Sequence, residues 1–175
     1  MEFANVIRGR RSCRAYRPDQ ITDEQLNALL EAAALAPVGM GRNDRELLRV
    51  VQNPTILTAL NADFAASIGN VAACPTYNAP TVIFVLGRRD DPEMMLGANA
   101  ACMVENMSLA ATDLGLGSVY LMGICRELKD SAQAATLLKI PADYRLVSAV
   151  AVGYPAQEIE AREPDLERYK TTFIK

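Results

Sequence analysis

The chain has 175 residues, of which 50% are hydrophobic and 22% charged, and its formal net charge is -3. This length suffices for one domain with a buried core, and the composition is typical of globular proteins. The negative charge and the 6% aromatic content disfavour nucleic-acid binding, which requires a basic surface. No apolar run approaches the roughly 20 residues that span a bilayer, so we expect no membrane partner.

The sequence contains no histidine, which excludes serine–histidine and cysteine–histidine catalysis as well as histidine metal ligation. Its four cysteines are scattered, without the spacing of a zinc site or a disulfide framework. This pattern indicates free thiols in a reducing compartment, and the first residues lack the layout of a signal peptide. We therefore expect a cytoplasmic protein without a metal. If it is an enzyme, a cofactor or carboxylates must carry the reaction.

The first half of the chain predicts helices and strands in alternation. Thr22 is a candidate N-cap, and Gln25 completes a capping box for a helix that continues toward Pro37. A Gly-rich turn follows at 39–41. The further elements expected in this half are a strand at 46–51, a helix at 54–67 and a buried strand at 82–86.

The longest periodic segment, 92–114, is apolar on nearly every face, which is typical of a helix at the centre of a core or an interface. Glu105 within it is expected to pair with a basic residue or to face solvent. The glycines that follow come after a helix and before a strand, the reverse of the order in a dinucleotide-binding loop. We therefore expect Gly115 or Gly117 to end the helix in the left-handed conformation.

The last part of the chain completes an α+β fold, in which helices flank a small mixed or antiparallel sheet. A strand is expected at 117–121, a helix at 126–138 and a final strand at 145–154. We expect one domain over 1–175, because no linker or repeat divides the chain. The polar tail at about 155–175 has apolar residues near its end, and packing on a partner subunit is one explanation.

Five arginines lie within ten residues near the N-terminus, although the whole chain is slightly acidic. They are Arg8, Arg10, Arg11, Arg14 and Arg17. Guanidinium groups this close repel one another unless an anion or several carboxylates lie among them, and their planar donors match phosphate and carboxylate oxygens. The hydroxyl of Ser12 lies within the cluster and adds a further donor. An anionic ligand is therefore the first hypothesis.

Four segments in this order resemble the FMN-dependent nitroreductase family over nearly the whole chain. Residues 10–16 are similar to the opening Arg-Arg-Ser-x-Arg-x-Phe signature, with Tyr16 in place of Phe. The other three are 36–43, the helix at 105–111 with its exit at 114–118, and the Gly-Tyr-Pro of 153–155 followed by Arg168. The resemblance implies a nitroreductase-like α+β fold and an intertwined homodimer, with two FMN molecules at the dimer interface.

The resemblance also assigns roles to individual residues. It implies that Arg10, Ser12 and Arg168 hold the FMN phosphate, with help from Lys170. Arg11 and Arg14 would reach the ribityl chain and the pyrimidine edge, where a guanidinium stabilises the negative charge of the reduced flavin. The segment whose backbone N–H faces flavin N5 would be Leu121, Met122 and Gly123.

The second motif departs from the family pattern at several positions that contact flavin or substrate in relatives. The candidate cofactor contacts in this segment are Val38, Gly39, Gly41 and Asn43. Val38 replaces the usual Ser or Thr, Gly41 replaces Asn, and Asp44-Arg45 stands where relatives often have Pro-Trp. Weaker FMN binding or a different substrate would follow. The chain also lacks the longer insertions of larger members, which suggests a more open pocket.

The function implied is that of an oxidoreductase in which NADH or NADPH reduces FMN and an electron-poor acceptor, such as a nitroaromatic or quinone, then oxidises it. This ping-pong scheme has no obligatory protein acid or base, so the flavin is the reactive centre. One alternative is a flavin-binding protein without turnover. Another is a different reaction on the same scaffold, such as dehalogenation, unsaturated-bond reduction or flavin fragmentation.

Overall fold

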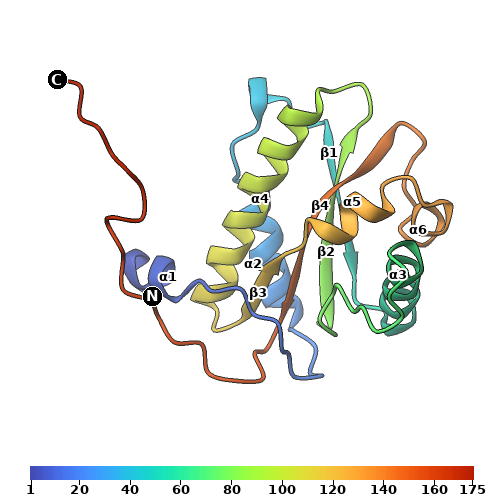
Figure 1. The fold of residues 1–175 in the computed structure, drawn as a ribbon, viewed down its shortest axis with the longest axis horizontal. Coiled ribbons are helices and arrows are strands. Elements are labelled where there is room, and N and C mark those ends of the chain that lie inside the picture. The colour runs from blue at the N-terminus through green and yellow to red at the C-terminus, as the bar shows by residue number, and fades with distance from the viewer.

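The computed structural model describes residues 1–175 and contains six α-helices, one short 3-10 helix and four strands (Figure 1). The helices are α1 (Phe3–Gly9), α2 (Asp23–Ala34), η1 (Gly39–Gly41), α3 (Pro54–Ser67), α4 (Glu93–Asp113), α5 (Gly123–Leu128) and α6 (Ala132–Leu137). The strands are β1 (Glu46–Val51), β2 (Thr81–Arg88), β3 (Gly117–Tyr120) and β4 (Tyr144–Gly153). None of the helices combines the length and hydropathy that crossing a membrane requires.

The four strands form one antiparallel sheet in the order β1-β2-β4-β3. β2 and β4 occupy its centre and are apolar along nearly their whole length, as expected of strands that are covered on both faces. A register shift between Val85 and Leu86 interrupts their pairing. The predicted α+β class is confirmed. The sheet was expected to be mixed or antiparallel, and the pairings between its four strands are all antiparallel.

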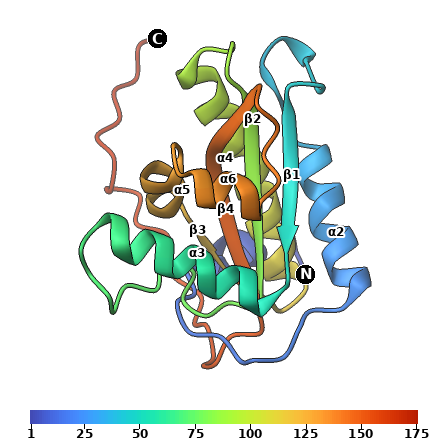
Figure 2. The ribbon, with the colours of Figure 1, turned by 90° about the vertical axis from the view of Figure 1, so that its right-hand side faces the viewer.

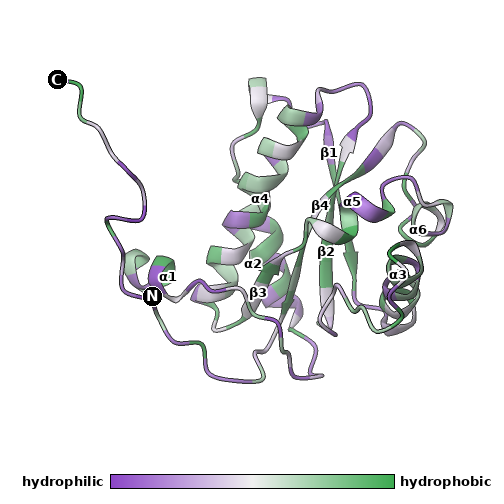
Figure 3. Cartoon of the chain, viewed as in Figure 1, coloured by the Kyte–Doolittle hydropathy of each residue, from purple (hydrophilic) through white to green (hydrophobic).

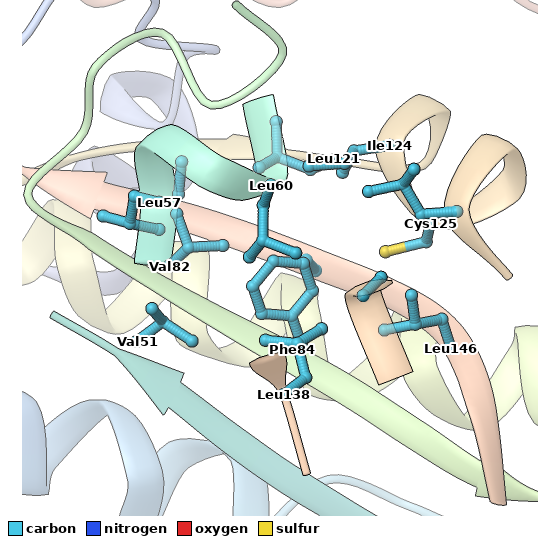
Figure 4. Packing of buried hydrophobic residues seen from close by; sticks show 14 of the residues in the cluster. Val51, Leu57, Leu60, Val82, Phe84, Leu121, Ile124, Cys125, Leu138 and Leu146 are labelled. Carbon is cyan, nitrogen blue, oxygen red and sulfur yellow. The ribbon is translucent and has the colours of Figure 1, made fainter. Parts of the chain in front are cut away.

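Helices cover both faces of this sheet, so the molecule has three layers (Figure 2). α2 and α4 lie on one face, where Ile83 and Val85 point into a core with Met107. α3, α5 and α6 lie on the other face, where Phe84 packs among the leucines of the helices (Figure 4). Phe84 is fully buried, which stabilises the fold by about 1.5–3 kcal/mol relative to an exposed ring.

Two helices differ from the sequence expectation. The predicted helix at 126–138 is wrong as a single element, because it is divided into α5 and α6. Ser131 separates them: its hydroxyl accepts from the N–H of Ala134 and donates to the carboxylate of Asp63, which makes it an N-cap. α1 was not anticipated, since it has only seven residues and a single buried side chain, Val6.

The exit from α4 depends on two glycines with different roles. Gly115 has a φ of +73°, so it supplies the expected left-handed helix end. Gly117 does not have positive φ, and its importance lies in close packing. A Cβ atom at Gly117 would lie 2.7 Å from the Sγ of Cys13 and 2.8 Å from its Cβ. The missing side chain therefore allows the N-terminal segment to lie directly against β3.

The C-terminal tail leaves the sheet after β4 and runs past the N-terminal residues before extending away from the body (Figure 1). Its backbone is tied to the rest of the chain where Ala156 N–H donates to Ala15 O and Arg162 N–H donates to Arg8 O. Beyond this point its side chains are exposed, including the apolar Phe173 and Ile174 near the end (Figure 3).

Candidate functional site

Residues 10–17, here called the arginine segment, form an extended stretch along the edge of the sheet. Cys13 N–H donates to Ser118 O at 2.8 Å, and Arg17 N–H donates to Tyr154 O at 2.8 Å. Bridges at Ser12 and Tyr16 join the segment to Ser118 on β3 and to Pro155, two residues after β4. Because an extended chain alternates its side chains, Cys13 is buried while Ser12 and Arg14 face outward.

Tyr16 helps to fix the backbone of the arginine segment. Its hydroxyl donates to Cys13 O at 2.8 Å. Burial, together with the neighbouring Cys13, raises the pKa of the Tyr16 phenol far above its ordinary value. The group therefore remains protonated at neutral pH and acts as a fixed hydrogen-bond donor. Its role is to hold the backbone from which the outward-facing side chains project.

The arginines of this segment have different neighbours. Arg10 Nε lies 3.4 Å from the carboxylate of Glu105 on α4, which confirms the expected pairing of that carboxylate with a basic residue. Arg11 donates to Glu160 O of the tail at 3.2 Å. The guanidinium of Arg14 lies over the ring of Tyr77, 5.9 Å from its centroid. Several arginine donors thus remain free for an anion.

Leu121, Met122 and Gly123 line an open pocket of about 340 Å³ just beyond β3. Leu121 N–H donates to Ala149 O at 2.7 Å, whereas Met122 N–H makes no hydrogen bond within the chain. Met122 is also 60% exposed. A backbone donor without a partner, on a residue that lines a pocket with apolar walls, is suited to an acceptor atom of a bound planar molecule.

The opposite wall of this pocket comes from a loop that the sequence analysis missed. Cys74, Pro75 and Tyr77 line it, and Tyr77 connects the pocket to Arg14. Tyr77 and Asn78 both have positive φ values, 54° and 55°. Such values are uncommon for residues other than glycine and often mark functional loops. The sequence offered no glycine or motif there to signal the turn.

The segment at 38–45 lies at the other end of α4. Gly39 N–H donates to Asn99 Oδ1 at 2.9 Å, and Asn99 Nδ2 donates to Glu46 Oε1 at 2.6 Å. The second oxygen of Glu46 is buried without a partner. Within one chain, no hydrogen bond or ion pair joins the candidate residues Val38, Gly41 and Asn43 to the arginine segment. The candidate site is therefore divided between two ends of one helix.

Arg45, one of the departures from the family pattern, has a structural role. It donates to both carboxylate oxygens of Asp91, at 2.7 and 2.8 Å, and to Asp90 at 2.6 Å. These hydrogen bonds lower the pKa of Asp91 and Asp90 and raise that of Arg45. The arginine thus ties the 38–45 segment to the turn that precedes α4.

The two candidate residues of the tail are exposed. Arg168 lies over the ring of Tyr169, 5.5 Å from its centroid, and lines a groove with Arg8 and Arg162. Neither Arg168 nor Lys170 forms an ion pair with another residue of the chain. The structure therefore connects Arg14 through Tyr77 to the pocket of the 121–123 segment, and Ser12 to β3 just before that segment. It places Arg10 beside Glu105 on α4 and leaves the tail residues apart. No group of carboxylates and thiols is arranged as a metal site.

Comparison with known proteins identifies the family to which this fold and this set of residues belong. The model of the nitroreductase family matches residues 7–154, which include the arginine segment, α4 and the 121–123 segment. The chain belongs to the nitroreductase family. The match ends at Tyr154, so it does not extend to the tail that carries Arg168 and Lys170.

Similar proteins span the whole length of the chain. A protein of Archaeoglobus fulgidus, provisionally named as an NADH dehydrogenase/NAD(P)H nitroreductase, is 33% identical over 170 residues, 94% of this chain and 91% of its own. An NADPH-flavin oxidoreductase of Vibrio harveyi is 27% identical over 90% of this chain and 67% of its own. A Bacteroides fragilis nitroreductase solved with bound FMN is 31% identical, with a TM-score of 0.86 and complete coverage of both chains.

Proposed function

We propose that the protein is an FMN-dependent oxidoreductase that transfers electrons from NADH or NADPH to an electron-poor acceptor, such as a nitroaromatic or a quinone. Its family, its NAD(P)H-linked relatives and the FMN-bound structure of a 31% identical relative support this function. The observation that carries it is the free N–H of Met122 in a pocket connected through Tyr77 to the arginine segment.

The residues present are suited to FMN. Ser12 is exposed on a fixed backbone, and Arg10 next to it is partly buried, with its Nε beside Glu105 and its other donors unused, which suits binding of the phosphate by a guanidinium and a hydroxyl. Arg11 and Arg14 follow on the same segment and would contact the ribityl chain and the pyrimidine edge. The pocket beside Leu121 and Gly123 has predominantly apolar walls, as required for a flat aromatic ring.

When bound, FMN supplies an atom, N5, that accepts hydride from the dinucleotide and later returns electrons to the acceptor. Each residue has a simpler task. The Met122 N–H would donate a hydrogen bond to the bound cofactor without adding a reactive side chain. Arg14 would stabilise negative charge on its ring, which would favour the reduced cofactor. No histidine or other proton-transfer side chain is required.

A homodimer is part of the proposal, because one chain separates residues that the function needs together. Between Glu93 and Glu105, the exposed positions of α4 are the small or apolar Met94, Ala98 and Ala101, which suit a helix interface. A second copy packed there would bring its own Val38, Gly39, Gly41 and Asn43, or its Arg168 and Lys170, to the arginine segment of the first. We propose a single domain over 1–175 whose tail, 155–175, packs on the partner.

The four cysteines are free, which supports our proposal of a cytoplasmic location, where thiols stay reduced. Two alternatives remain part of the proposal. The altered 38–45 segment, with Arg45 occupied by Asp90 and Asp91, favours a different acceptor on the same scaffold, as in dehalogenation or unsaturated-bond reduction. It is also compatible with a flavin-binding protein that does not turn over.

The visible absorption spectrum tests the proposal. Purified protein should be yellow, release FMN on denaturation, and lose its absorption near the flavin maximum when NADH or NADPH is added without oxygen. A quinone or nitroaromatic should then restore the colour. Colourless protein that gains no FMN on reconstitution would overturn the function. Bound FMN that neither dinucleotide reduces would instead establish the flavin-binding alternative.

A further inference from the structure

A second cleft lies beside the proposed flavin pocket and shares Met122 with it. It has a volume of about 220 Å³ and is formed by residues of α4, α5 and β4. Its apolar lining residues are Leu96, Met122, Cys125, Leu146 and Val147. Because Met122 borders both spaces, a molecule in this cleft would lie next to any planar ring bound in the first pocket.

Cationic side chains surround this apolar lining. Arg126 lies on α5, Lys129 directly follows α5 and Arg145 lies on β4, while Glu93 is the single acidic residue that lines the cleft. The charges of these lining residues sum to +2, and Glu127, which pairs with Arg126 at 2.8 Å, reduces the excess to +1. This excess of positive charge is opposite in sign to the net charge of -3 of the whole chain. The cleft therefore attracts anions locally.

Arg145 is the most informative of these residues. Its side chain is only 23% exposed, and its nearest carboxylate, that of Glu93, is 3.8 Å away. No hydrogen bond of the folded chain uses its guanidinium, in contrast to Arg45, which makes three. A largely buried guanidinium with unused planar donors is costly unless a ligand satisfies it.

We propose that this cleft binds the anionic group, a carboxylate or phosphate, of the substrate that reacts at the flavin. This inference rests on the proposed function, because it places the substrate beside Met122. The apolar lining would cover the hydrophobic part of the molecule, and Arg145, with Lys129 and Arg126 at the rim, would bind its anion. The substrate class is therefore an organic anion with an apolar body.

Two molecules could carry this anion. In a ping-pong scheme the reductant and the acceptor occupy the same space in turn, so the anion belongs either to the acceptor or to the extra phosphate of NADPH. The holoenzyme should be assayed with 4-nitrobenzoate and neutral 4-nitrobenzamide as acceptors, and with NADPH and NADH as reductants. These two comparisons identify the source of the anion.

The informative variant is Arg145→Met, which keeps the apolar volume of the strand position and removes the charge. We expect wild-type kcat/KM to favour the anionic member of at least one pair by about tenfold, as one charge-assisted contact would give. Arg145→Met should abolish that preference and leave the neutral member within about twofold. Arg89→Gln is the matched control, because this exposed arginine bonds Ala142 O outside the cleft.

Binding without turnover gives an independent readout. In titration calorimetry of the holoenzyme, benzoate should bind about tenfold more tightly than benzamide, and Arg145→Met should equalise them. Should Arg145→Met fold poorly, Arg126→Gln on α5 and Lys129→Gln directly after it, both at exposed positions, should together weaken benzoate binding severalfold. Reducible flavin with no anion preference in either assay would overturn this inference alone, whereas absent or irreducible flavin would overturn the proposed function.

Discussion

The two ends of α4 hold neighbouring segments in different ways. Near its C-terminal half, the arginine segment is fixed by its backbone, which bonds to Ser118 and Tyr154 and packs on the bare Cα of Gly117. Near its N-terminal half, the 38–45 segment is fixed by side chains, through Asn99 and Arg45. Both segments carry residues that the family resemblance assigns to the cofactor.

This difference bears directly on ligand binding. A segment fixed by its backbone leaves the side chains of Ser12 and Arg14 exposed, and its attachment does not depend on protonation. A segment fixed by Arg45 depends on two ionised carboxylates. We therefore expect the arginine segment to be a preformed binding surface and the 38–45 segment to be sensitive to conditions. Five predictions test this contrast.

The largest effect is expected from Arg10→Ala. Loss of a charge-assisted contact to the phosphate should weaken FMN binding by on the order of 100-fold, measured by titration calorimetry of apoprotein. Arg17→Ala is the matched control, because Arg17 belongs to the same segment and lies over Tyr154 without an assigned role. Equal FMN affinity in Arg10→Ala and wild-type protein would contradict the assignment.

Gly117→Ala should disturb the contact between the arginine segment and β3. The added Cβ would overlap Cys13, which should lower the free energy of unfolding by about 1–3 kcal/mol and weaken FMN binding in parallel. Gly115→Ala is the control: its positive φ makes alanine destabilising by about 1 kcal/mol, with no displacement of the segment. Urea unfolding and FMN titration of both variants separate the two effects.

Asn99→Ala should loosen the attachment of the 38–45 segment to the N-terminal half of α4. It removes the acceptor for Gly39 N–H and the partner of the buried Glu46 carboxylate, at a cost of about 1–3 kcal/mol in unfolding free energy. Tryptic cleavage after Arg42 should also become faster. Asn106→Ala, which loses only a bond to Ala32 O, should cost less and leave cleavage at Arg42 unchanged.

Acid should weaken the 38–45 segment through Asp90 and Asp91. Because Arg45 lowers their pKa in the folded state, their stabilisation is present above the ordinary carboxyl pKa of about 4 and is lost as pH falls through the lower folded values. Arg45→Gln should therefore flatten the acid dependence of the urea midpoint. Arg49→Gln should not, since Arg49 bonds only backbone carbonyls.

The smallest effect is expected from Arg168→Ala. Arg168 is exposed on an extended tail, so a rearrangement of the tail or the charge of Lys170 can take over its contact with FMN. FMN binding should therefore weaken only severalfold, by about 1 kcal/mol or less. The dependence of FMN affinity on protein concentration should reveal whether the residue acts across a dimer. An effect as large as that of Arg10→Ala would show that both arginines contribute equally.

Much of the fold could be predicted because local signals agree with the packing. The capping box at Thr22, Pro54 at the start of α3, and the continuous apolar run of β2 each indicate one element, and the structure has all three. The division at Ser131 was missed because Leu128 and Ala132, on either side of the break, keep the i, i+4 spacing of one helix. There, a capping hydroxyl bonded to Asp63, 68 positions away, decides the outcome.

The site was less predictable for a physical reason. The arginine segment and the 121–123 segment could be found by resemblance, but the loop at 73–77 could not, because its role follows only from its place opposite Met122. Likewise, nothing in the spacing of Arg145 indicates that it lies largely buried without a hydrogen bond, since that depends on its neighbours on α4 and α5.

Cys13 gives this protein an internal reporter. Its thiol is buried because the arginine segment lies flat on Gly117, whereas Cys74 and Cys102 are partly accessible. Alkylation of Cys13 therefore requires the segment to lift from the sheet, and the slow phase of a labelling time course measures how often it does. Mass spectrometry of one thiol can thus follow the opening of the proposed cofactor site, with and without FMN, in unmodified protein.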